Sequence, residues 1–157
     1  MTQQNLDLLV RFYEAFGRND GDTMAACYTA DATFSDPVFT DLHGSEPGAM
    51  WRMLTARSSD LEVELVDRAA DGDTGSAHWV ARYTFGQTGR QVVNDIRSTF
   101  RFRDGLIAEQ RDTFDLYRWT RQALGPMGIV LGWTPIVQGG VRRKARAGLD
   151  QFMARKG

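Results

Sequence analysis

Residues 28–48 read YTADATFSDPVFTDLHGSEPG. The run from Ala32 to Phe34 predicts an extended strand, and Pro37 must end it, because proline has no N–H to donate and its ring holds φ near about −65°. The strand end then carries one carboxylate, Asp36. Alternate side chains of a strand point the same way, so Asp36 follows Phe34 if Phe34 faces the interior. A carboxylate beside aromatic side chains is a candidate acid or base.

Helices are expected on both sides of this segment. A short helix is expected to run through Tyr28, and Ser45 is a predicted N-cap for another helix over about residues 46–57. This later helix places Met50, Trp51 and Leu54 on one side. At the start of the chain, aromatic and aliphatic residues at three- and four-residue spacing predict an amphipathic helix that ends at Gly17. Its stripe contains Leu6, Leu9, Phe12, Tyr13 and Phe16.

From Leu61 onward the apolar residues alternate with polar ones. Turn signals at residues 71–73, 86–89 and 104–105 divide this region into four runs, which predicts four strands in an antiparallel meander. Each run has one mostly apolar face, which is expected to pack on the helices. These faces include Val63, Trp79, Ala81, Tyr83, Phe85, Ile96, Phe100, Leu106, Ala108 and Phe114.

Four polar residues break the apolar face of the meander: Asn94, Ser98, Gln110 and Asp112. A buried polar group without a partner costs about 1–3 kcal/mol, and an unpaired charge costs more. Several such residues on one face therefore predict a polar-lined pocket within the apolar core.

Length and composition indicate one globular domain. The chain has 157 residues, of which 42% are hydrophobic and 25% charged. The single cysteine, Cys27, excludes an internal disulfide, and no spacing of Cys and His predicts a metal site or a cofactor. No secretory signal and no membrane-spanning run is apparent, so a cytoplasmic protein is expected.

The last part of the chain differs from the rest in charge. From residue 116 onward it carries eight Lys or Arg and one acid, Asp150, whereas the preceding residues carry an excess of acids. Residues 117–157 are predicted to form a helical extension beyond a core of residues 6–116. The extension contains a short helix with Trp119 and Leu124, an apolar loop over residues 125–135, and a basic helix. The apolar stripe of that basic helix is Val141, Ala145, Leu149 and Phe152.

Three roles are open for this extension. The stripe can pack on the body or on a second subunit, the apolar loop can cover a cavity, or the helix can anchor the protein to a membrane. The stripe is too small for strong bilayer binding, so no stable membrane association is expected. Nucleic-acid binding is not expected either, because the body is acidic and shows no platform of aromatic and basic residues.

The central segment resembles a known family. CYTADATFSDPV at residues 27–38, with GSEP at residues 44–47, resembles the ketosteroid isomerase branch of the nuclear-transport-factor-2-like, or SnoaL-like, family. In that branch the Asp of the Asp-Pro-Val step is the proton-shuttling base, and it falls on Asp36. The resemblance implies an α+β cone, in which a strongly curved antiparallel sheet wraps around a long N-terminal helix and two further helices. It also implies an apolar cavity and a homodimer.

A second resemblance concerns the last strand of the meander. RDTFDL at residues 111–116 is similar to a strand of limonene epoxide hydrolases, in which the Asp of the Arg-Asp step is catalytic, and that Asp falls on Asp112. Of two inward carboxylates, one can act as a base and the other as an acid, because repulsion and burial raise the pKa of one above that of the other.

The sequence also departs from both relatives. A gapless register places Phe12 where the isomerases have a catalytic tyrosine, with Tyr13 one position away, and their second oxyanion donor falls on Ser98. The Arg and Asp of the epoxide hydrolases fall on Trp79 and Ala81. Steroid isomerisation and epoxide hydrolysis by the relatives' own residue sets are therefore not expected.

Each candidate also has a plain structural alternative. Asp36 can be a turn residue that accepts backbone N–H groups near Pro37, and Asp112 can be paired with an arginine. His43 can rim a cavity mouth or lie at the surface, and His78 is expected to be a solvated cross-strand residue.

The leading functional hypothesis is a cofactor-independent isomerase or cyclase that moves a proton on a small apolar carbonyl compound. Asp36 is the base and Asp112 the second acid or base, while Tyr13, Asn94, Ser98 and Gln110 orient the substrate. A non-catalytic module that binds an apolar ligand is the alternative, and an epoxide-hydrolase-like hydrolase is a further one. The predicted substrate-binding residues are Phe12, Tyr13, Phe34, Trp51, Trp79, Tyr83, Asn94, Ser98, Gln110 and Phe114.

Overall fold

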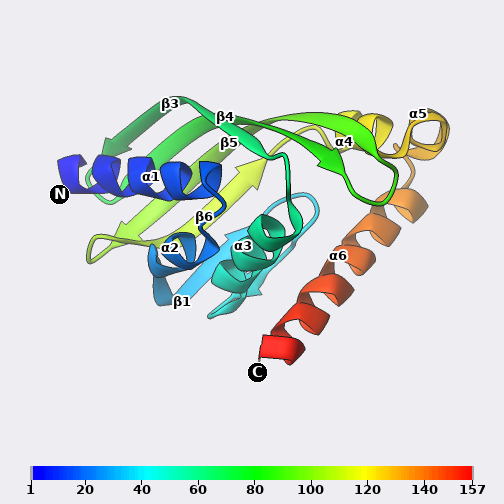
Figure 1. Cartoon of the computed structure of the whole chain (residues 1–157). Coiled ribbons are helices and arrows are strands. Elements are labelled where there is room, and N and C mark those ends of the chain that lie inside the picture. Colours follow the sequence, from blue (N-terminus) through cyan, green and yellow to red (C-terminus); the bar gives the residue numbers. More distant parts are fainter. Residues whose placement is uncertain (1, 157) are drawn as a thin grey trace.

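One curled sheet organises the molecule, and the computed structural model describes residues 2–156 of the chain (Figure 1). Within these residues the strands are β1 (Tyr28–Ser35), β2 (Leu42–His43), β3 (Glu62–Asp71), β4 (Thr74–Phe85), β5 (Arg90–Arg103) and β6 (Leu106–Thr113). They lie in the order β2-β1-β6-β5-β4-β3, and the sheet does not close on itself. The predicted four-strand meander is confirmed as β3 to β6.

The hairpins form where the turn residues predict them. Asp104 and Gly105, between β5 and β6, have φ of 54° and 75°, and a tight hairpin with two positive φ angles favours Asp-Gly. The β4–β5 ladder runs from Thr74↔Arg101 to Phe85↔Arg90 without a break. Along β5 buried and exposed residues alternate strictly from Gln91 to Arg103, so one face of the sheet is apolar and the other is charged.

The start of β6 differs from the prediction. Arg101 pairs with Glu109, but Phe102 pairs with Ile107, so Ala108 is an extra residue in β6. Such a bulge reverses which side chains face inward. Ile107 is therefore fully buried, whereas Leu106 and Ala108, which the alternation placed on the buried face, are only half-buried.

The beginning of β1 also differs from the prediction. The short helix α2 (Gly21–Ala26) ends before Tyr28, and Tyr28 is the first residue of the strand. β1 pairs in parallel with β6, with Phe34 opposite Gln110, and its register shifts between Tyr28 and Thr33. This irregularity turns the Tyr28 side chain into the core, where it is 8% exposed.

Helices α1 (Thr2–Gly17) and α3 (Glu46–Arg57) lie on the concave side of the sheet (Figure 1). Both were predicted, with their ends correctly placed at Gly17 and Arg57. The predicted cap of α3 is wrong in detail, because the Ser45 side chain makes no capping hydrogen bond, although Pro47 occupies the first turn as expected. The aromatic stripe of α1 faces the sheet, so the core consists largely of packed rings.

The C-terminal extension forms three helices: α4 (Leu116–Leu124), α5 (Pro126–Leu131) and α6 (Pro135–Lys156). The segment expected to be a loop thus contains a short helix, and the terminal helix begins earlier than its apolar stripe. None of the helices within residues 2–156 is both long enough and apolar enough to cross a membrane.

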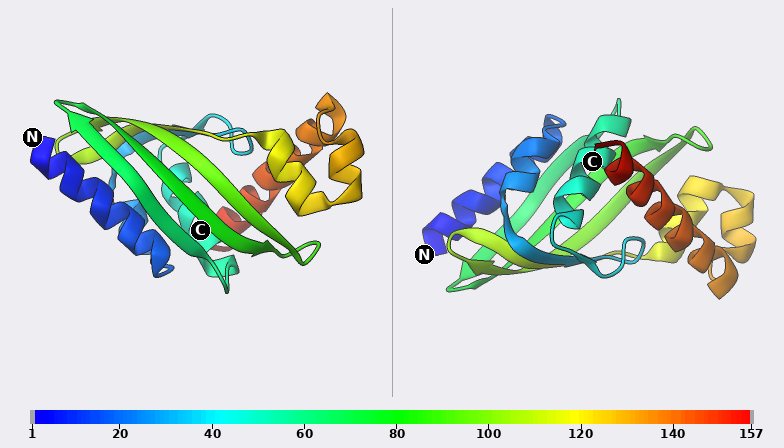
Figure 2. Two further views of the ribbon diagram at one scale, coloured as in Figure 1. Left: turned by 90° about the horizontal axis from the view of Figure 1, so that it is seen from above. Right: turned by 90° about the horizontal axis from the view of Figure 1, so that it is seen from below.

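Helix α6 packs on the body, as the first of the three open roles proposed. It runs from α5 back towards α3 on the concave side of the sheet (Figure 2). Leu149 of α6 is fully buried, and Arg146 forms an ion pair with Glu46 at the start of α3. Arg142 Nε donates to the carbonyl oxygen of Pro37 at 2.9 Å, which ties α6 to the loop after β1. The extension therefore covers the side of the cone where Asp36 lies.

Candidate active site

Asp112 is the centre of a buried polar network. It lies on the inner face of β6 and is 3% exposed. Its Oδ1 accepts hydrogen bonds from Ser98 Oγ at 2.6 Å and from Gln110 Nε2 at 3.0 Å. Ser98 is directly opposite Asp112 on β5, and Gln110 is two residues earlier on β6. The alternative that Asp112 is paired with an arginine is not what the structure shows.

Two chains of hydrogen bonds converge on this carboxylate. Ser98 Oγ accepts from Tyr13 Oη at 3.2 Å and from Trp79 Nε1 at 2.9 Å. Gln110 Oε1 accepts from the hydroxyl of Tyr28, whose oxygen in turn accepts from Trp51 Nε1 at 2.7 Å. The network therefore draws on α1, α3 and four of the strands. Tyr13, and not Phe12, directs a hydroxyl from α1 into the site.

The donors fix the direction of each bond. An indole N–H can only donate, so both tryptophans must donate to the oxygens they face. Ser98 Oγ, which already accepts two bonds, uses its single proton on Asp112 Oδ1. Because Oδ1 accepts from two donors, any proton that Asp112 carries lies on Oδ2. Oδ2 accepts no hydrogen bond within the part of the chain that the structure describes, so it is the oxygen left for a substrate.

Burial makes Asp112 a weaker acid than an exposed aspartate. The pKa of Asp112 is raised to about 7. Loss of solvation is the largest cause, the hydrogen bonds from Ser98 and Gln110 act in the opposite direction, and the charge of Asp36 adds to the increase. Burial likewise raises the pKa of Tyr13 well above its usual value, so its hydroxyl stays protonated. Near neutral pH Asp112 therefore exchanges readily between acid and carboxylate.

Asp36 is held by the backbone. Its Oδ1 accepts from the N–H groups of Val38 at 2.7 Å and Phe39 at 2.6 Å, and its own N–H donates to the carbonyl of Phe39. The plain alternative of a turn aspartate is thus correct. The side chain is half-buried; burial raises the pKa of Asp36 to about 6, and the charge of Asp36 contributes to raising the pKa of Asp112.

Tyr83 and Trp119 lie on the Asp36 side of the interior. Trp119 Nε1, on α4, donates to Tyr83 Oη at 2.8 Å, and the charge of Asp36 contributes to raising the pKa of Tyr83. Phe114 packs against both groups of core residues and links this side to the Asp112 network. Asn94 is buried on the same face of β5 but takes no part in the hydrogen bonds to Asp112 within residues 2–156.

The remaining predicted substrate-binding residues form an aromatic core. Phe12, Phe34 and Trp51 are at most 3% exposed. The ring of Trp51 lies 5.7 Å from Phe12, 5.7 Å from Phe34 and 6.5 Å from Trp79, measured between ring centroids. These rings pack beside the network and form the centre of the core.

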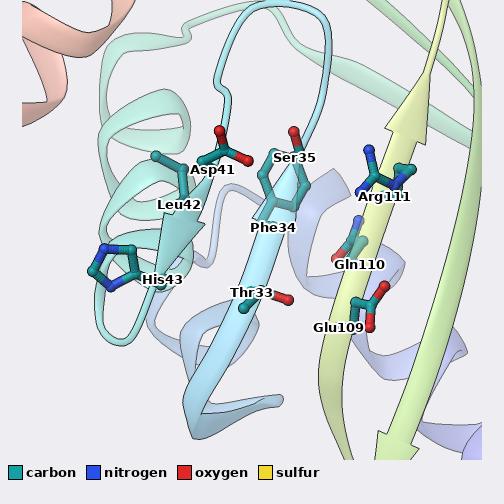
Figure 3. Close-up of a pocket in the computed structure, with 9 residues that line it drawn as sticks. All are labelled: Thr33, Phe34, Ser35, Asp41, Leu42, His43, Glu109, Gln110 and Arg111. Atoms are coloured by element: carbon teal, nitrogen blue, oxygen red, sulfur yellow. The ribbon is translucent and has the colours of Figure 1, made fainter.

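Two shallow hollows lie on the outer face of the sheet and not in the cone. One, of about 200 Å³, lies over β2, β1 and β6, and Figure 3 shows its lining side chains, among them Thr33, His43 and Arg111. The other, of about 240 Å³, lies over β3, β4 and β5. Neither is lined by Asp36 or Asp112, so the apolar cavity of the cone stays a prediction.

Both histidines lie away from the two carboxylates. His43 is exposed and lines the outer hollow over β1 (Figure 3), which favours the surface alternative. His78 Nε2 lies 2.8 Å from Asp95 Oδ1 across the β4–β5 ladder, as expected of a cross-strand residue. Among residues 2–156 no three side chains of metal-binding type converge.

Sequence reasoning missed Tyr28 and Trp119 as members of the site. The bulge after Tyr28 breaks the alternation that identifies inward residues, and Tyr28 was taken as the end of a helix. Trp119 was recognised only as part of a short helix. An indole N–H or phenolic hydroxyl in a buried position needs a partner, and this is the signal that could have linked Trp119 to Tyr83.

Comparison with known proteins gives the same architecture. The family described as a SnoaL-like domain matches residues 9–110. A solved M. tuberculosis epoxide hydrolase of the LEH-like type is 24% identical, with a TM-score of 0.67 over 85% of this chain and 98% of that chain. A putative SnoaL-like polyketide cyclase from Jannaschia is 18% identical, with a TM-score of 0.70 over 80% and 94%.

A further solved structure, a protein of ketosteroid isomerase-like fold from Catenulispora acidiphila in complex with trimethylamine, is 18% identical, with a TM-score of 0.67 over 82% and 97%. At these identities the likeness concerns the fold. No curated protein matches the sequence.

Proposed function

The chain belongs to the SnoaL-like domain family, and we propose that it is a cofactor-independent isomerase or cyclase that moves a proton on a small apolar carbonyl compound. The observation that supports this most is the pair of inward carboxyls with raised and unequal pKa values, about 6 for Asp36 and about 7 for Asp112. At neutral pH the first is mostly ionised and the second is protonated in about half of the molecules. One can accept a proton while the other donates one.

The two free oxygens define the proposed steps. Asp36 Oδ2 takes the proton from the carbon next to the substrate carbonyl, and the electron pair of that C–H bond moves towards the carbonyl oxygen. Asp112 Oδ2 donates its proton to this oxygen, which stabilises the enol. Asp36 then returns its proton to another carbon, and Asp112 recovers its own from the oxygen. The sequence needs no external oxidant, reductant or metal to balance.

The network behind Asp112 has a supporting role in this proposal. Ser98 and Gln110 hold Oδ1, so Oδ2 stays directed at the substrate. Tyr13 and Trp79 hold Ser98 in turn. Pre-organised groups of this kind lower the cost of charge development, because nothing has to reorient during the reaction.

The test is isomerisation of a β,γ-unsaturated cyclic ketone to its conjugated isomer, followed by ultraviolet absorbance. We expect Asp36→Asn to reduce kcat by about 100- to 10,000-fold. Asp41→Asn is the matched control: this aspartate lies in the same loop, is exposed, and has φ of 55°, which asparagine tolerates. Wild-type turnover by Asp36→Asn on any substrate found would remove the assignment.

A non-catalytic role in binding an apolar ligand is the second candidate. The aromatic residues around Trp51 favour it, since sites for apolar ligands are lined mainly by aromatic and aliphatic side chains. In that case Asp36→Asn and Asp112→Asn leave ligand affinity unchanged or improve it, because a buried charge is removed. Isothermal titration with the same ketones separates this outcome from catalysis.

Epoxide hydrolysis has less support in this chain. The two positions where the epoxide hydrolases carry Arg and Asp are Trp79 and Ala81, and the Trp79 indole is committed to Ser98. A small apolar ligand and a second copy of the chain are the partners we propose.

A further inference from the structure

The end of the molecule formed by α5 exposes a cluster of large apolar side chains. We call residues 127–136 the α5 tip. Six of its side chains are at least 45% exposed, and Trp133 and Ile136 reach 66% and 82%. The six are Met127, Ile129, Val130, Leu131, Trp133 and Ile136. Large apolar residues gathered at one place indicate an interaction surface, whereas single ones do not.

The α5 tip is a built feature and not a loose loop. Gly128 lies directly on α4: a Cβ atom at Gly128 would come 2.0 Å from the carbonyl oxygen of Thr120. Tyr117 Oη on α4 also donates to the carbonyl of Ile129 at 2.8 Å. In both views of Figure 2 the tip projects at the end of the molecule opposite the N-terminus.

Five consecutive carbonyls of the tip are hydrogen-bonded within the chain, although the tip is exposed. Consecutive carbonyls from Gly128 to Gly132 accept bonds from other groups of the chain. Trp133 Nε1 donates to the carbonyl of Val130 at 3.0 Å, and Gln138 Nε2 donates to that of Gly132 at 2.9 Å. A loop in water does not need these bonds. A segment that enters hydrocarbon does, because lipid tails supply no hydrogen-bonding partner.

The charged residues that precede and follow the tip in the sequence are all basic. No acidic residue occurs between Asp115 and Asp150. Arg121 lies beside Gly128, and the Arg143 guanidinium lies near Gly139 at the start of α6. Among the described residues neither arginine forms a salt bridge. A second copy of the chain is a poor occupant, since a symmetric contact would bring like charges together.

We infer that the α5 tip is a peripheral docking site for an anionic lipid bilayer. The apolar side chains enter the interface between headgroups and acyl chains, while Arg121 and Arg143 contact anionic headgroups. A protruding, internally bonded tip fits a bilayer better than a protein partner, which would offer its own donors and acceptors. The docking is reversible, because a small apolar surface with few charges, such as the α5 tip, binds a bilayer weakly.

This site differs from the one considered in the sequence. The apolar stripe of α6 was weighed as a membrane anchor and rejected, and in the structure its Leu149 is buried against the body. The docking residues precede that stripe. The expectation that no stable membrane association occurs is compatible with reversible docking.

The test is co-sedimentation of the full chain with vesicles. We expect binding to phosphatidylcholine vesicles that contain phosphatidylserine, loss of this binding at high salt, and little binding to pure phosphatidylcholine. The variant Trp133→Ser with Ile136→Ser should lower the partition coefficient about tenfold or more. Arg121→Gln with Arg143→Gln should lower it by a similar factor on anionic vesicles only.

A matched control exists on β3. Val66 is 49% exposed, and changing it to serine removes exposed apolar surface outside α4 and the tip. This variant should bind as the wild type does. Brominated lipids should quench the fluorescence of Trp133, because the other three tryptophans are buried.

The proposal is overturned if the wild type fails to sediment with anionic vesicles, or if the tip variant and the control lose binding equally. It is also overturned if the tip variant abolishes self-association of a chain that does not bind vesicles. That result would assign the tip to a second copy.

Discussion

The two inward carboxyls are held in different ways. Asp112 is held by side chains from the opposite strand and its own strand, which are in turn held by residues of α1, α3, β1 and β4. Asp36 is held by two backbone N–H groups of the loop that follows β1. In both, Oδ1 accepts two hydrogen bonds, whereas Oδ2 accepts none from the described residues 2–156. The position of Asp112 Oδ1 thus depends on other side chains, whereas that of Asp36 Oδ1 depends on the backbone of one turn.

The difference also appears in the acidity of the two groups. Asp112 lies deeper and has a pKa of about 7, whereas Asp36 keeps some exposure and has a pKa of about 6. Deeper burial raises the pKa of a carboxyl more, because the charged form loses more solvation. The two carboxyls therefore differ in acidity with depth, and four measurements can test how each is held.

The largest effect is expected for Asp112→Asn at about pH 8. The pKa of Asp112 is higher in the folded chain than its usual value of 3.8. Its contribution to the stability of the fold is therefore fully present below about pH 4 and is lost as the pH rises to about 7. Asparagine resembles the protonated acid, since it accepts at Oδ1 and donates from the other position. We expect the variant to be more stable than wild type by about 4 kcal/mol at about pH 8.

The measurement is urea unfolding at several pH values, with Asp41→Asn as the exposed control. The advantage of Asp112→Asn over wild type should shrink towards zero near pH 4. A constant difference across the range would show that Asp112 ionises as an ordinary surface carboxyl does.

The second prediction concerns Ser98, which links Asp112 to α1 and β4. Ser98→Ala removes one donor from Asp112 and leaves Tyr13 Oη and Trp79 Nε1 without their shared acceptor. Each buried, unpaired donor costs about 1–3 kcal/mol. We expect a loss of about 3 kcal/mol in the free energy of unfolding near neutral pH, measured with urea.

Thr99→Ala is the control for this change, because Thr99 is the next residue on β5 but faces solvent. It should alter stability by less than about 0.5 kcal/mol. If Ser98→Ala lowers the free energy of unfolding as little as Thr99→Ala does, the Tyr13 hydroxyl and the Trp79 indole have found other acceptors. The hydrogen bonds around Asp112 would then not depend on Ser98.

The sequence predicts the frame of this site better than its details. Alternation along β5 correctly places Ser98 inward, and the Asp-Gly turn at residues 104–105 correctly predicts the β5–β6 hairpin. These are local signals, because period and turn type act over a few residues.

The parts that the sequence does not predict depend on distant pairing. The parallel contact of β1 with β6 joins residues about 80 apart, and no local pattern indicates it. Two bulges shift the phase of alternation, one after Tyr28 and one at Ala108, so the inward positions of Tyr28 and Ile107 were missed. The position of α6 over the Asp36 loop likewise depends on contacts such as Arg142 with Pro37.

The third prediction concerns the shallower carboxyl. Asp36→Asn keeps the acceptor for Val38 and Phe39 and removes the partly buried charge. The pKa of Asp36 in the folded chain is also raised, to about 6. The stability of the variant relative to wild type should therefore increase as the pH rises, as it does for Asp112→Asn. The gain at about pH 8 should be smaller, about 2 kcal/mol after allowance for exposure. A gain larger than that of Asp112→Asn would reverse the assigned order of depth.

The smallest effect expected is the electrostatic coupling between the two carboxyls. The charge of Asp36 contributes to raising the pKa of Asp112, after burial. In Asp36→Asn the pKa of Asp112 should therefore lie slightly below its wild-type value, as measured by ¹³C NMR of the labelled carboxyl carbon. The gains of the two asparagine variants should also sum to more than the gain of the double variant, because the repulsion is removed once. An unchanged pKa would mean that the carboxyls do not share one interior, and the division into base and acid would lose its electrostatic basis even if each group remained buried.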